Sequence, residues 1–180
     1  EEEETTSTTT TGSTAVGTAA VTLEGTAVAQ YVPKNASSVK VGTVKISATS
    51  GDVTVRSLTV SRSGLGNAAD IASTNGIRAA QNGVVISSSA DYYNSTSQKG
   101  TVYFSPSLVV KAGSSTMVDV LVNLSGAENS QHQFTLDSVN TDSTVTGAPV
   151  TLGLLNTTSY ITATTNASLE SVGGNVTPGK

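Results

Sequence analysis

The chain contains no cysteine and no tryptophan, one histidine, two phenylalanines and four prolines, and only 12% of its residues are charged. General acid–base and nucleophilic catalysis need histidine, cysteine, lysine or carboxylates gathered where their pKa values can be tuned. Here the ionisable residues are few and scattered along the sequence. We therefore expect no enzyme activity, no catalytic residues and no bound cofactor.

Basic clusters and long apolar runs are absent as well. The net charge is −4, and the nine lysines and arginines never cluster, which argues against binding to a nucleic-acid backbone. No run of 18 apolar residues is present, so we expect no membrane-spanning helix. The first residues form no signal peptide, so a secreted protein would be represented here by its mature form.

In place of these residues the chain has 29 threonines, 26 serines and 17 glycines, with a steady supply of valine. Such a composition suits pleated sheets with hydroxyl-covered faces. The absence of cysteine fits both a cytosolic protein and a surface protein without disulfides. The scarcity of charge and the abundance of small hydroxyl residues favour an extracellular or cell-surface location.

Apolar and polar residues alternate with the period of two that is typical of half-buried strands. This pattern predicts strands around residues 21–31, 44–48, 53–60, 102–104, 116–124, 133–136, 145–154 and 160–163. The Asn82-Gly83 pair predicts a hairpin, a one-residue shift at Arg56-Ser57 predicts a bulge, and Ser105-Pro106 should end or bend its strand. No stretch sustains a helical period, so no helix longer than two turns is expected.

The sequence divides into three zones. Residues 1–14 form an acidic, threonine-rich extended arm, residues 15–165 a β-sandwich, and residues 166–180 a C-terminal strand or tail that belongs to the sandwich or to an intersubunit contact. The fold class is all-β. At 18.0 kDa the chain is long enough for one sandwich or barrel domain with its own core.

Several turns and core strands form a recognisable series: Val44–Thr49, Asp52–Val55, Leu58–Gly64, Asn67–Ile71, Phe104–Pro106, Leu108–Gly113 and Val120–Val122. These segments resemble tandem β-sandwich repeats of bacterial surface-layer and fibre-forming proteins. The resemblance covers about residues 15–176 and implies an immunoglobulin-like antiparallel sandwich with an extended N-terminal arm, and no enzymatic site. A single repeat preceded by an acidic arm is similar to a protomer of a pilus-like fibril joined head to tail.

Such a protomer could lend a strand to its neighbour, as in donor-strand complementation. The alternation between Ala15 and Val32 makes this segment the favoured donor, and the alternating stretch Asn166–Val176 is the other candidate. The alternative is that both are ordinary edge strands of their own domain. The candidate intersubunit residues are Ala15, Val21, Leu23, Ala27, Ala29 and Tyr31.

Other surface chemistry is possible. Six sequons predict glycosylation, at Asn35, Asn94, Asn123, Asn156, Asn166 and Asn175; bare polar surface is the alternative. Tyr92 and Tyr93 could contact a sugar or a neighbouring subunit; the alternative is that one ring packs into the protein and the other is exposed. The aspartates stand apart from each other, so no metal site is predicted, and His132 is expected to be a solvated turn residue.

These observations predict a structural subunit of an extracellular pilus-like fibril or surface array. It would polymerise head to tail by intersubunit β-strand addition, with copies of itself as partners and covalent glycans as a further decoration. The alternative is a monomeric cell-surface adhesive or carbohydrate-binding module.

Overall fold

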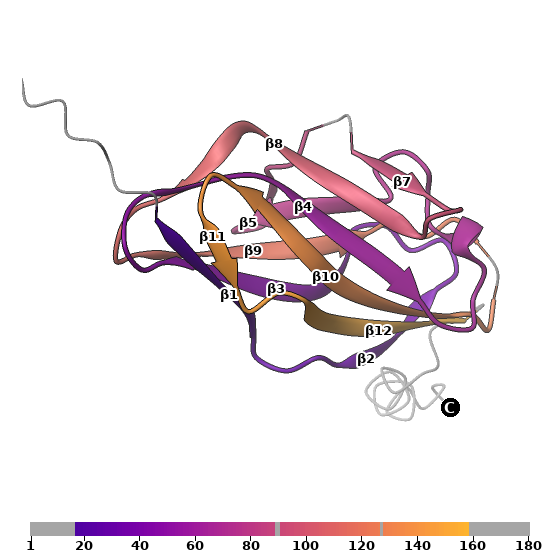
Figure 1. Cartoon of the computed structure of the whole chain (residues 1–180). Helices are drawn as coiled ribbons and strands as arrows, with labels where there is room; N and C mark the ends of the chain where they lie inside the picture. Colours follow the sequence, from indigo (N-terminus) through magenta and orange to yellow (C-terminus); the bar gives the residue numbers. More distant parts are fainter. Residues whose placement is uncertain (1–16, 89–90, 127, 159–180) are drawn as a thin grey trace, which may run out of the picture.

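A computed structural model describes residues 17–88, 91–126 and 128–158 of the chain, and they form an all-β sandwich of two packed sheets (Figure 1). The first sheet has the strand order β11 (Thr144–Thr146), β1 (Thr18–Glu24), β3 (Val39–Ala48), β9 (Ser115–Val122), β5 (Ile77–Gln81) and β6 (Val84–Val85). The second has the order β2 (Ala29–Pro33), β12 (Val150–Thr158), β10 (Gln131–Thr141), β4 (Val53–Ser63), β8 (Lys99–Val110) and β7 (Tyr92–Asn94).

The core lies between the sheets and comes directly from the alternation in the sequence. Along β9, Val118, Val120 and Val122 are buried while the residues between them are only partly so. The same alternation buries one face of β3, β4, β8 and β10. Because branched side chains pack well on a pleated surface, the valine-rich sequence fills this core with few aromatic rings.

Two local predictions are confirmed. Asn82 and Gly83 join β5 to β6 with φ angles of 51° and 79°, the left-handed backbone that a two-residue hairpin turn requires. The pairing of β4 with β8 shifts between Val55 and Ser57, where the bulge was expected. Among the described residues the one helical element is the 3-10 turn η1 (Ala68–Asp70).

Two pairings depart from an all-antiparallel sandwich. Strand β1 lies parallel to β11, and β12 lies parallel to β2. The segment predicted as one alternating stretch from residue 15 to 32 is in fact two strands in different sheets, because the chain turns at Gly25, with φ of 79°, and leaves the first sheet. Residues 1–14, Ala15 and the predicted strand 160–163 lie outside the described residues.

Strand β8 is long but interrupted. Tyr103 pairs with Ser57 of β4, and the next paired residue of β8 is Leu108, opposite Val55. The residues between them, around the Ser105–Pro106 bond, are not in regular register with β4. The proline therefore breaks the register, as predicted, but it does not end the strand, because pairing resumes and continues to Val110.

Candidate functional site

The outer edge of β8 changes character along its length. β7 pairs with β8 only at Lys99–Thr101. The next positions are also covered: the Tyr103 N–H donates to Oδ1 of the buried Asp91 at 2.9 Å, and Phe104 bridges to Ser87. From residue 105 to 110 no described strand lies beyond β8 in the sheet order. Pro106 has no N–H, so residues 107–110 are the part of this edge that can form a regular ladder.

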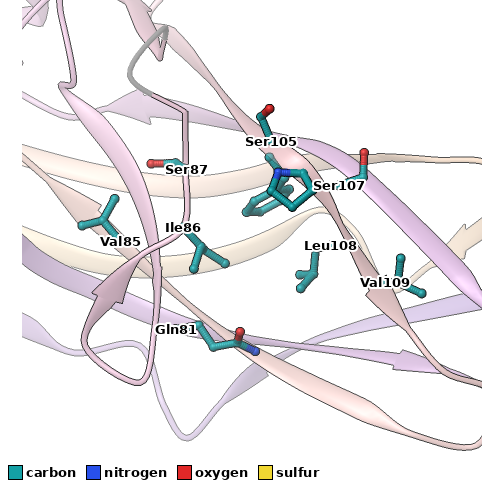
Figure 2. A pocket seen from close by; sticks show the side chains of 10 residues that line it. Gln81, Val85, Ile86, Ser87, Ser105, Ser107, Leu108 and Val109 are labelled. Atoms are coloured by element: carbon teal, nitrogen blue, oxygen red, sulfur yellow. The ribbon is translucent and has the colours of Figure 1, made fainter.

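A hollow of about 430 Å³ opens beside this edge. It lies between β8 and the end of the first sheet, where β6 consists of two residues only. Its lining is Gln81, Val85, Ile86, Ser87, Phe104, Ser105, Pro106, Ser107, Leu108 and Val109, without any charged residue. Figure 2 shows Ile86, which follows β6, and Leu108 of β8 facing the hollow, with the hydroxyls of Ser105 and Ser107 directed away from it. We call this feature the β8 groove.

The β8 groove combines two properties that an added strand needs. The unpaired backbone of β8 offers hydrogen-bond donors and acceptors, and the apolar floor takes alternate side chains of an extended segment. Ile86 and Leu108 pack against the core from the floor of the groove, whereas Val109 beside them is 50% exposed. Natural sandwiches usually shorten, charge or cover such an edge; here Pro106 shortens it and nothing among the described residues covers the rest.

A second feature is a buried polar cluster, and it corrects the prediction for His132. This residue lies in β10 and is completely buried, so it is not a solvated turn residue. The Nε–H of Arg62, itself 5% exposed, donates to His132 Nδ1 at 3.0 Å. Arg62 also donates to Gln98 Oε1 at 3.0 Å and to the carbonyl oxygen of Gly66. The flanking glutamines made the segment look polar, while the alternation of β10 turns His132 inward.

The hydrogen bond from Arg62 fixes the state of the imidazole. Since Nδ1 accepts, the neutral ring carries its proton on Nε2, which lies 3.5 Å from Asp70 Oδ2. Burial lowers the pKa of His132, the Arg62 charge lowers it further, and Asp70 opposes them. Both ring nitrogens thus face protein groups. No solvent reaches the ring, and the cluster joins β4, β10 and η1 through Arg62, His132 and Asp70.

The structure does not bring the predicted strand-exchange residues together. Val21 is buried in β1, which pairs with β3 and β11 of its own chain, and Leu23 packs partly against the core. Ala27 and Ala29 are exposed, and Tyr31 is 71% exposed on β2, at the edge of the second sheet. The sequence signal at the β8 groove was the Ser105-Pro106 pair after the predicted strand 102–104, which was expected only to end or bend that strand.

The described sequons differ in their surroundings. Asn35 is exposed in a turn, and Asn94 is exposed but accepts from the N–H groups of the turn that follows it. Asn123 is half-buried: its Nδ2 donates to the Asn75 carbonyl at 2.6 Å, and its Oδ1 accepts from the backbone at 2.6 Å. Asn156 is half-buried in β12. Asn166 and Asn175 lie outside the described residues.

The adjacent tyrosines separate. Tyr93 is 1% exposed and belongs to the core, whereas Tyr92 is 59% exposed. Tyr92 lines a second hollow of about 190 Å³ together with the hydroxyl residues Ser73, Ser95 and Ser125. Ala69, Ile71 and Tyr93 complete the lining, so this small surface combines serine hydroxyls with apolar and aromatic groups.

In the part of the chain that the structure describes, no group of three or more His, Cys, Asp or Glu side chains could hold a metal ion. Over the same residues, no helix is long and apolar enough to cross a membrane. A comparison with protein-family models and with curated proteins finds no match to this chain.

Proposed function

We propose that the protein is a structural subunit of an extracellular pilus-like fibril or surface array, joined to copies of itself by β-strand addition. The observation that carries this proposal is the β8 groove, where an unpaired strand edge borders an uncharged hollow with an apolar floor. Backbone hydrogen bonds to β8 would supply affinity, and the hollow would select the side chains of the added strand.

The composition supports an assembly role. Contacts made by backbone and apolar groups are little affected by salt, and the hydroxyl-rich exterior gives a polar surface with few charges. An extracellular location, an immunoglobulin-like relationship, an extended N-terminal arm and covalent glycans belong to the same proposal. The exposed sequons at Asn35 and Asn94 are the described positions best placed for glycans.

The test is direct observation of the purified full chain. Electron microscopy and analytical ultracentrifugation across a wide concentration range should show filaments or long oligomers, and raising the salt concentration should not dissolve them. A protein that sediments as a monomer at the highest concentration, with no filaments on the grid, would refute the proposal.

The hollow beside Tyr92 favours a second candidate, a cell-surface adhesive or carbohydrate-binding module. An exposed tyrosine ring flanked by serine hydroxyls can stack on a sugar ring and bond its hydroxyls. A glycan array probed with the wild-type protein and with Tyr92→Ala distinguishes the two candidates. Binding lost in the variant supports the adhesive module, and equal signals from both proteins exclude this surface.

A further inference from the structure

We propose that the β8 groove receives residues 161–169 of a second copy of this chain, which names the donor strand and therefore rests on the proposed function. The first support is the pattern of that segment. Ile161, Ala163, Thr165, Ala167 and Leu169 stand at alternate positions, and all but Thr165 are apolar; the intervening residues are Thr162, Thr164, Asn166 and Ser168. An extended chain would direct the first set into the groove and the second set toward solvent.

Charge separates this segment from the acidic arm, residues 1–14. That stretch contains four glutamates and no large apolar side chain, whereas residues 161–169 carry no charge. The lining of the groove includes no lysine or arginine to pair with a carboxylate. Burying an unpaired carboxylate beside Ile86 and Leu108 would be costly, while burying isoleucine and leucine is favourable. The groove therefore selects the C-terminal segment over the acidic one.

Reach decides between a chain's own groove and that of another copy. Leu108 lies opposite Val55 of β4. Eight residues farther along β4, Ser63 pairs with Gln133 of β10, which in turn pairs with Leu154 of β12, so Ser63 and Leu154 are at the same height in the sheet. Strands β4 and β12 run in the same direction, so Thr158 is displaced from Leu108 by about twelve residues of strand rise, or ~40 Å. β12 and β8 are also separated by β10 and β4, which adds ~14 Å across the sheet.

The connection from Thr158 to Ile161 consists of two residues and spans at most about 11 Å. It cannot carry the alternating segment into the groove of its own chain. A second copy placed beyond the end of β12 can present its groove there. Each subunit would then lend a strand from the end of the sandwich where β12 finishes and receive one near the opposite end, where β8 finishes (Figure 1). This arrangement is head to tail, so it can be repeated from one copy to the next.

Two matched double variants of the full chain test the donor. Ile161→Asp with Leu169→Asp places two carboxylates on the face directed into the groove, and Thr162→Asp with Ser168→Asp places the same charge on the opposite face. We expect the first variant to need at least about tenfold more protein than wild type for assembly, and the second to assemble like wild type. Equal assembly of both variants, while wild type forms filaments, overturns the named donor and leaves the proposed function standing.

Cross-linking tests the contact itself and does not depend on filaments. The chain has no cysteine, so Val109→Cys and Thr164→Cys or Asn166→Cys variants can be made and mixed. Mild oxidation should give a mixed disulfide dimer, and adding an excess of a peptide with the sequence of residues 159–171 should suppress it, whereas a scrambled peptide should not.

The remaining outcomes also decide the question. A chain with both cysteines that forms an internal bridge at high dilution would show that the tail occupies its own groove, which overturns the proposal. Absence of any mixed disulfide at high concentration overturns it too. If wild type forms no filaments but the mixed disulfide appears and the peptide suppresses it, the donor contact stands and the fibril function fails.

Discussion

Mild acidification should weaken this fold through the side chain of His132. The ring is completely buried, and its pKa is lowered, first by burial and then by the charge of Arg62. In the unfolded chain the same ring titrates near its ordinary value of about 6.5. As the pH falls below that value, the unfolded state binds a proton that the folded state rejects, so the free energy of unfolding falls with decreasing pH.

The magnitude follows from linkage. A single proton bound only by the unfolded state gives a slope of up to about 1.4 kcal/mol per pH unit. The slope begins below about pH 6.5 and ends at the pKa of the folded protein, where protonation would place an imidazolium beside the Arg62 guanidinium. Above about pH 7 the ring is neutral in both states and contributes no slope. Asp52 and Asp142, whose pKa values are lowered by hydrogen bonds, act in a separate window below about pH 4.

Urea unfolding of wild type and His132→Gln at pH 7.5, 6.5, 5.5 and 5.0 measures this contribution. The glutamine retains an acceptor for Arg62 and cannot titrate, so the difference between the two proteins should shrink as the pH falls. Because the chain has one histidine, its NMR signals also report the tautomer and the pKa without ambiguity. A difference that is constant with pH, or a folded-state pKa at or above the ordinary value, would refute the argument.

Three further outcomes are expected. Gly66→Ala should destabilise the protein by about 1–3 kcal/mol in urea unfolding, because a Cβ there would lie 2.5 Å from His132 Cε1; a neutral effect would mean that the ring can move. Arg62→Met should cost at least about 2 kcal/mol, since several buried acceptors lose their donor, including His132 Nδ1; unchanged stability would contradict this accounting. Peptide mass spectrometry of the native protein should find glycan at Asn35 and none at Asn123, whose amide nitrogen is already engaged; an occupied Asn123 would contradict the assignment.

Alternation alone predicted much of the fold, because a two-sided sheet must place every second residue in the core. It located β3, β4, β9 and the Asn82-Gly83 hairpin. It could not place strands in sheets: β1 and β2 read as one alternating stretch, and only the left-handed backbone at Gly25 separates them. The sequence also could not predict the parallel pairing of β11 with β1 or that of β2 with β12, because tertiary packing sets the pairing partners and leaves no local pattern.

The site was harder to predict than the fold. The β8 groove depends on where neighbouring strands stop, and β6 ends after Val85 for reasons that no residue in β8 reveals. The buried cluster was missed because Arg62 and His132 are 70 residues apart and each sits among polar neighbours. The sequence predicted a strand at 160–163 and a candidate donor at Asn166–Val176, but without the groove there was no chemical ground for preferring this region to Ala15–Val32.

The cluster and the groove are connected through the end of β12. His132 lies opposite Leu155, and Ser130 and Thr157 exchange backbone and hydroxyl hydrogen bonds of 2.9 Å beside it. The proposed donor is joined to the end of β12 by two residues only. If the end of β12 had to become ordered on binding, the entropy cost would reduce the affinity, so a rigid end of β12 favours assembly. The lowered pKa of the folded ring means that His132 takes a proton only well below its ordinary value of about 6.5. Protonation at such acid pH should weaken filament formation, although no ionisable side chain lines the groove. Filaments of His132→Gln should lack this acid sensitivity, and equal sensitivity in both proteins would show that the two features act independently.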